Sequence, residues 1–205
     1  MPIIDCKLIS GYTENTQKLL AERITDAACS STGAAPEFVT ITITEISPNN
    51  YMRGRTQKQP AKAPLQSNDI IQNYLNAMEA RDLKLANSFI DDKFHITCPG
   101  NKIFYSLEDF LNWGKVRYKK IAKDISSIDL SFNGLDAFVY CHGTLKGEWL
   151  NGQSFAGIRF IDKFHTKNSK IISQEIWNDL DLMKEAWNMN EDQMENLVLS
   201  YFKGV

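Results

Sequence analysis

Pro2 is the residue whose position most directly suggests chemistry, because it follows the initiator methionine in "MPIIDCKLISGYT". If Met1 is removed, Pro2 carries a secondary amine that can accept a proton. An α-amine titrates near pH ~8, and burial among apolar strands would lower its pKa further. Because a general base works best with a pKa near the working pH, Pro2 is a candidate catalytic base.

A second group of candidates lies near the end of "KIISQEIWNDLDL", where three acids, Glu175, Asp179 and Asp181, accompany an indole. A carboxyl group in an apolar pocket beside Trp177 would have a raised pKa and could donate a proton. Asp179 is the best acid candidate of the three. The alternative is that Asp179 or Asp181 only caps the next turn.

The elements around Pro2 are predicted to be strand, helix and strand. Polar residues alternate with apolar ones in "IIDCKLI", which is typical of a half-buried strand. Thr13 is a suitable N-cap for the helix that follows, and Gly33 can end it. "FVTITITEI" alternates strictly and predicts the second strand, parallel to the first. Such a unit is too small to bury a core alone and should need oligomer contacts.

The segment "GRTQKQPAKAPLQSN" has the composition of an extended linker. We therefore expect a first unit at residues 1–56, a linker at 57–66, a second domain at 67–189 and a closing helix at 190–205. In the second domain we expect two helices, then a helix that Ser106 caps and that continues to Ala122, and strands from Asp124 onward. Helices followed by antiparallel strands predict an α+β fold, a sheet curled over its helices.

Residues 2–54 resemble the 4-oxalocrotonate tautomerase family. The matching features are the penultimate proline, the strand–"GYT"–helix junction, the "AP" before the second strand, and "ITE" near its end. The resemblance implies that an N-terminal proline acts as general base on a keto–enol substrate. It also implies that arginines hold the substrate's carboxylates and that an aromatic residue shields the proline.

The resemblance assigns roles to further residues. Tyr51 falls where the family places its shielding aromatic residue. Tyr12 and Thr40 stand where the family has arginines, and Arg53 and Arg55 could reach a carboxylate instead. Without a bidentate guanidinium clamp, a smaller or mono-anionic enol is easier to accommodate than a dicarboxylate.

Residues 68–187 resemble the SnoaL-like and ketosteroid-isomerase-like superfamily in element order, in "ANSFIDDKFHITCPG" and in "KIISQEIWNDLDL". The resemblance implies a cone with a deep pocket, found in isomerases, cyclases, hydrolases and non-catalytic binders alike. Cys98 stands where the isomerases carry an aspartate base, which argues against steroid-type isomerase chemistry. The cyclase-like members use an acid on or after the last strand. The resemblance therefore implies Asp179 as the acid and places Trp177 beside the substrate.

Bulk composition narrows the classes of function. The net charge of −2 gives no argument for nucleic acid or a membrane surface, and no apolar run approaches the ~20 residues of a membrane span. No signal peptide is recognisable, and four well-separated cysteines are expected to be reduced thiols, so we expect a cytoplasmic protein. The three histidines lack ligand-like spacing, and no nucleotide-binding motif occurs. We expect no metal and no cofactor.

Three functional hypotheses remain open at this stage. The first is an isomerase with Pro2 as base, which moves a proton on a small carbonyl compound. The second places all chemistry or ligand binding in the second domain and leaves assembly to the first. The third is a binding protein without catalysis that takes an apolar ligand. All three expect a homo-oligomer.

Overall fold

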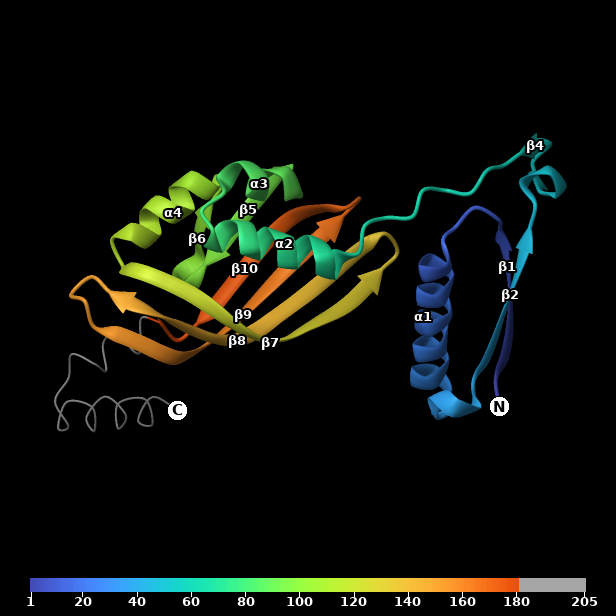
Figure 1. Ribbon diagram of the computed structural model, residues 1–205, viewed down its shortest axis with the longest axis horizontal. Helices are drawn as coiled ribbons and strands as arrows, with labels where there is room; N and C mark the ends of the chain where they lie inside the picture. Colours follow the sequence, from blue (N-terminus) through green and yellow to red (C-terminus); the bar gives the residue numbers. More distant parts are fainter. Residues whose placement is uncertain (181–205) are drawn as a thin grey trace. The chain divides into compact units, whose positions relative to one another are not determined.

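The computed structural model describes residues 1–180, which fall into two units: Met1–Pro64 and a second unit that begins at Leu65 (Figure 1). The α+β class predicted from the sequence is confirmed, since a β-α-β unit precedes a curved sheet that carries helices. The closing helix predicted at 190–205 lies outside the described residues.

The first unit consists of strand β1 (Ile3–Ile9), helix α1 (Glu14–Thr32) and strand β2 (Thr40–Ile46). The strands are parallel, as predicted, with Ile3 opposite Thr40 and Ile9 opposite Ile46. Short 3-10 turns occur at Pro36–Phe38 (η1) and Pro48–Asn50 (η2). A two-residue hairpin of β3 (Met52–Arg53) and β4 (Thr56–Gln57) follows.

Both predicted ends of helix α1 are confirmed. The hydroxyl of Thr13 accepts a hydrogen bond from the Thr16 N–H at 3.3 Å, which satisfies one of the donors left open in the first turn. Gly33 adopts a left-handed conformation with φ 72°, and its N–H donates to the Cys29 carbonyl at 2.9 Å. Glycine takes this conformation without the penalty of a Cβ atom.

The first unit lacks a core of its own. Throughout residues 1–64, all of which the structure describes, every side chain is at least partly exposed, including the apolar face of helix α1. Ile3 is 70% exposed. A two-stranded sheet with one helix cannot enclose enough apolar surface to offset the entropy of folding. The unit therefore needs further surface to pack against.

The second unit packs three helices on one side of a curved sheet (Figure 1). The helices are α2 (Ser67–Glu79), α3 (Leu83–Phe89) and α4 (Leu107–Lys115). Among the described residues the sheet has the strand order β6-β5-β10-β9-β8-β7. Its strands are β5 (Ile90–Cys98), β6 (Lys102–Phe104), β7 (Tyr118–Asn133), β8 (Asp136–Trp149), β9 (Ser154–Lys167) and β10 (Lys170–Asn178). A short turn, η3 (Pro99–Asn101), joins β5 to β6.

Strands β7 to β10 form the predicted antiparallel run, and β10 also pairs with β5 in parallel. The core lies between helix α2 and the sheet. Tyr74 contacts Phe94 and Phe164 edge to face, with ring centroids 6.3 and 6.0 Å apart. All three rings are at least 97% buried, which gives this unit the apolar interior that the first one lacks.

The helix predicted to continue to Ala122 is wrong in its second half. Helix α4 ends at Lys115, and strand β7 begins at Tyr118. Gly114 permits the change, since a Cβ on that residue would lie 2.7 Å from Tyr118 Oη, and the Arg117 N–H donates to the Gly114 carbonyl at 2.9 Å. The basic run at 115–123 therefore lies mostly on a strand.

Candidate functional site

Pro2 lies directly before strand β1 and opposite the start of strand β2. Its carbonyl accepts a hydrogen bond from the Thr40 N–H at 3.0 Å. The structure therefore brings two predicted site residues, Pro2 and Thr40, to the same end of the two-stranded sheet. The side chain of Thr40 is exposed there, and Pro2 is half-buried.

Tyr51 and Arg53 form a second pair of predicted site residues. The Arg53 Nη2 donates to the Tyr51 hydroxyl at 3.0 Å. Arg55 lies in the turn of the hairpin with φ 63°, and both arginines are exposed. A phenol with two guanidinium groups close by in the chain can bind a carboxylate or an enolate oxygen.

These two pairs occupy opposite ends of the first unit. Because β1 and β2 run parallel over seven residues each, their two ends are separated by ~20 Å. Pro2 lies at the starting end, whereas β4 lies beyond the far end of β2 (Figure 1). Tyr12 follows the end of β1 and is tied to helix α1 by a 3.5 Å hydrogen bond from Gln17 Nε2 to its carbonyl. Within one chain, Pro2 is therefore not close to Tyr51, Arg53 or Tyr12.

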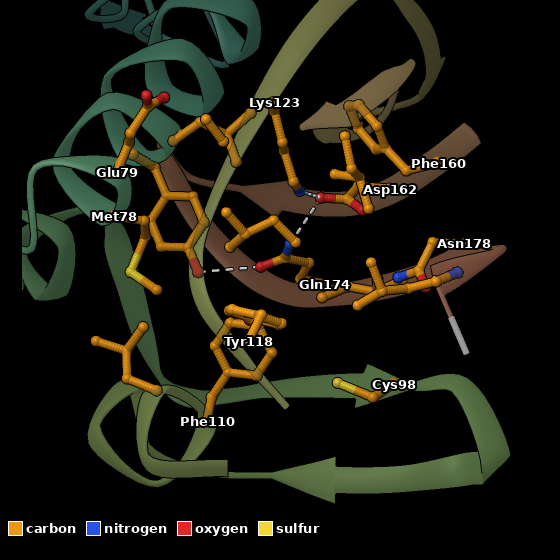
Figure 2. A pocket seen from close by; sticks show the side chains of 18 of the residues that line it. Met78, Glu79, Cys98, Phe110, Tyr118, Lys123, Phe160, Asp162, Gln174 and Asn178 are labelled. Carbon is orange, nitrogen blue, oxygen red and sulfur yellow. Dashed lines mark hydrogen bonds and ion pairs between the residues drawn. The ribbon is translucent and has the colours of Figure 1, made fainter. Parts of the chain in front are cut away.

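The second unit contains a cavity of about 170 Å³ between helices α2 and α4 and the concave side of the sheet. One ordered water needs only ~10–15 Å³, so the cavity has room for a small molecule. Its wall is mainly apolar and aromatic, and a few polar groups converge on it (Figure 2). The aromatic residues that line it are Tyr74, Phe110, Trp113, Tyr118 and Phe160.

A polar network crosses this wall. Asp162 on β9 is fully buried, and its Oδ2 forms an ion pair with Lys123 Nζ from β7. The same oxygen accepts a hydrogen bond from Gln174 Nε2 at 2.9 Å, and the Oε1 of Gln174 accepts one from the Tyr74 hydroxyl at 3.0 Å. Figure 2 shows this chain of contacts from helix α2 across the sheet.

One oxygen of this network is unsatisfied. Asp162 Oδ1 is buried and has no hydrogen-bond partner among the described residues. Lys123 Nζ also lies 4.7 Å from the centre of the Phe160 ring, and its side chain is 25% exposed. The carboxylate is therefore enclosed, whereas the ammonium group keeps a partial route to solvent.

Burial controls the protonation of several groups around the cavity. It raises the pKa of the Cys98 thiol to about 11, against the lowering effect of the Arg117 charge. It also raises the pKa of Tyr118 and, together with the charge of Asp162, the pKa of Tyr74. These three groups are therefore protonated at neutral pH and can act only as hydrogen-bonding or apolar wall groups.

The acid predicted for this unit, Asp179, is not among the residues that line the cavity. Its Oδ2 pairs with the exposed Arg159 at 2.8 Å, and Trp177 is 48% exposed. Their neighbours Asn178 and Leu180 do line it. A catalytic role for Asp179 stays a prediction, and Asp181 lies outside the described residues.

Sequence reasoning missed Asp162, although its position carries a signal. In strand β9 the buried residues alternate through Ile158, Phe160, Asp162 and Phe164. The strand period of two therefore places a carboxylate in an apolar row. An acid at an inward position of a core strand almost always has a partner, which here comes from β7.

In residues 1–180 no three His, Cys, Asp or Glu side chains gather in a way that could hold a metal ion. None of the helices described is long and apolar enough to cross a membrane.

The first unit matches a family model described as "Tautomerase enzyme" over residues 2–58. A protein of Bacillus cereus described as "Probable tautomerase" is 41% identical over 54 residues, which are 26% of this chain and 88% of the relative. A relative with the same description in Staphylococcus aureus is 37% identical over 51 residues, 25% of this chain and 84% of its own. The tautomerase resemblance is thereby confirmed.

Solved structures similar to this chain include an NTF2-like protein of unknown function from Burkholderia pseudomallei. It is 14% identical, covers 56% of this chain and 92% of its own, and has a TM-score of 0.49. A protein from Jannaschia described as "Putative SnoaL-like polyketide cyclase" is 13% identical, covers 62% of this chain and 94% of its own, and has a TM-score of 0.46.

Proposed function

The chain belongs to the tautomerase family through its first unit, and from this premise we propose that it is an isomerase in which Pro2 is the general base. The observation that carries the proposal is the place of Pro2 at a strand end, where the Thr40 N–H fixes its carbonyl. With the carbonyl fixed, the amine nitrogen is held in one direction. Removal of Met1 is required, since an acylated proline nitrogen has no basic lone pair.

The proposed reaction moves one proton from oxygen to carbon. The neutral amine of Pro2 removes the hydroxyl proton of an enol, and the electrons of the O–H bond form the carbonyl. The carbon–carbon double bond then takes a proton from the ammonium form of Pro2, which restores the base. Atoms and charges balance without a cofactor, because the ammonium form made in the first step supplies the proton for the second.

The site is completed by a second copy of the chain. Pro2 and the Tyr51–Arg53 pair lie at opposite ends of one first unit, ~20 Å apart by strand length. The lack of any buried side chain in residues 1–64 independently supports assembly. We assign Tyr51 and Arg53 of one copy to the Pro2 of another, which joins base and anion-binding group in one site.

The substrate is a small enol with one carboxylate. Tyr12 and Thr40 are neutral, so Arg53 and Arg55 supply the positive charge that the predicted site residues offer. Arg53 already donates to Tyr51, and its remaining guanidinium N–H groups suit a carboxylate in a forked contact. A 2-hydroxy-alkenoate or phenylenolpyruvate has this charge and this reacting group.

Complementation between two variants with different defects, Pro2→Ala without activity and Arg53→Ala with a raised KM, tests the shared site. The Pro2→Ala and Arg53→Ala chains are co-expressed in equal amounts so that they assemble at random. If each site takes Pro2 from one chain and Arg53 from another, about a quarter of the sites regain both residues. A mixture without any activity at the wild-type KM would refute the shared site, and an active Pro2→Ala protein would refute the base itself.

A further inference from the structure

The ion pair of Lys123 and Asp162 carries a desolvation penalty that an apolar pair of side chains would avoid. Asp162 is fully buried at an inward position of β9, between Phe160 and Phe164 in the row of buried side chains. Replacing a buried pair by apolar residues of similar volume is often neutral or stabilising, so stability alone does not require charges here. A buried charge that lines a cavity is a candidate functional group.

The unsatisfied oxygen of Asp162, Oδ1, indicates that a ligand with a hydrogen-bond donor would bind here. A buried carboxylate oxygen without a donor is unfavourable, and a donor placed in the adjoining cavity removes that cost. Cys98 and Tyr118 line the cavity as well, but the structure records no hydrogen bond from either to Oδ1. Among the described residues, Oδ1 is therefore open to a donor that enters the cavity.

The surrounding charges favour a neutral donor over a cationic one. Lys123 already neutralises Asp162. Among the described residues, two arginines, Arg81 and Arg117, line the same cavity against one further acid, Glu79. An ammonium ligand would meet excess positive charge there. A hydroxyl group donates one hydrogen bond to the carboxylate and adds no charge.

The other residues that line the cavity favour a flat, apolar ligand. Aromatic rings from helix α4, Phe110 and Trp113, and from the sheet, Tyr118 and Phe160, face the cavity with aliphatic side chains between them. Rings of this kind pack well against a flat apolar molecule, by offset or edge-to-face contact. Few polar groups and many apolar ones are typical of small-molecule sites.

We infer that this cavity binds a flat, apolar compound with a hydroxyl group, a phenol or an enol, whose O–H donates to Asp162 Oδ1. Lys123 and Gln174 hold the carboxylate through Oδ2 and so keep the other oxygen available. Tyr74 fixes Gln174 in turn, so the acceptor is preorganised by three elements, β7, β10 and α2. This inference stands apart from the chemistry proposed for Pro2.

Calorimetric titration of the full-length protein with two matched probes tests it. The probes are 2-naphthol and 2-methoxynaphthalene, which share a flat body and differ in the hydroxyl donor. We expect the wild type to bind 2-naphthol about tenfold or more tightly than the ether, as expected for a hydrogen bond to a charged acceptor. Equal affinities, or no binding of either probe, would overturn the inference.

A double variant shows whether the preference comes from Asp162. Lys123→Met with Asp162→Leu removes both charges together and avoids an unpaired buried group, so the fold should persist. This variant should bind both probes with similar affinity.

The control variant carries Lys146→Gln with Asp124→Asn. These changes remove an exposed ion pair of 2.5 Å between β8 and β7, so the preference for 2-naphthol should remain. A preference for 2-naphthol that survives in the double variant would refute the role of Asp162. If that variant does not fold, Asp162→Asn should reduce the preference for 2-naphthol, because a neutral amide oxygen is a weaker acceptor than a carboxylate.

Discussion

The two members of the Lys123–Asp162 pair should contribute unequally to stability when they are removed singly. Among the described residues, Lys123→Met leaves the fully buried Asp162 with one donor, Gln174 Nε2. Asp162→Asn leaves a lysine whose side chain is already 25% exposed. The lysine can extend to water, and the aspartate cannot. We therefore expect the lysine variant to be the less stable of the two.

The magnitude follows from the buried carboxylate that loses its partner. Removing one member of a buried ion pair costs ~3–5 kcal/mol, because an uncompensated charge stays behind. We expect this loss for Lys123→Met. For Asp162→Asn we expect ~1–2 kcal/mol, the loss of a charge-assisted hydrogen bond that is partly replaced by water.

Urea unfolding followed by tryptophan fluorescence measures both values. All four tryptophans lie at or beyond residue 113, so the signal reports on the second unit alone. An Asp162→Asn protein that is less stable than Lys123→Met would refute the reasoning.

Further predictions concern single residues and use simple assays. Gly143→Ala should destabilise the second unit by about 2 kcal/mol or more in the same urea assay, because the new Cβ would lie 2.0 Å from the Asp124 carbonyl oxygen. The control, Gly134→Asn at φ 62°, should cost less than about 1 kcal/mol. Iodoacetamide at pH 8 should modify Cys6 and Cys29 and spare Cys98 and Cys141, because burial raises the pKa of both protected thiols from 9.0 to about 11, and mass spectrometry reads the result. The same shifts predict that thermal stability falls as pH rises from 9 toward 11, since the folded state keeps protons that the unfolded state releases, and Cys141→Ala should reduce this slope. Arg53→Ala should raise KM for an enol carboxylate about tenfold with a smaller effect on kcat, and an unchanged KM would exclude Arg53 from substrate binding.

Local signals were sufficient for the first unit. The Thr13 cap, the Gly33 stop and the parallel strands all follow from neighbouring residues, and each is confirmed. In the second unit, the change from helix to strand after Lys115 was missed because a basic run with scattered apolar residues fits either period. The close approach of Tyr118 to Gly114 accompanies the change from helix to strand, and a pattern of residue types does not reveal such a contact.

The candidate sites, too, could be predicted only in part: the sequence indicated residues, and the structure showed which of them lie together. The family pattern led to Pro2, Tyr51 and Arg53, but only strand register shows that the proline and the other two lie at opposite ends of one unit. Asp162 could be placed on the inward face by alternation, yet its importance depends on Lys123, 39 residues earlier in the chain. The register of β7, β8 and β9 brings the two together, and no local rule predicts that register.

The most direct test of the central claim is the rate of phenylenolpyruvate ketonisation by the wild type and by Pro2→Ala, after intact mass has verified loss of Met1 in both. Our account predicts a wild-type rate well above buffer that falls in the variant by ~100-fold or more, the range of general-base catalysis. Equal rates in the two proteins, with both oligomers intact, would contradict it and would leave the first unit with a role in assembly alone.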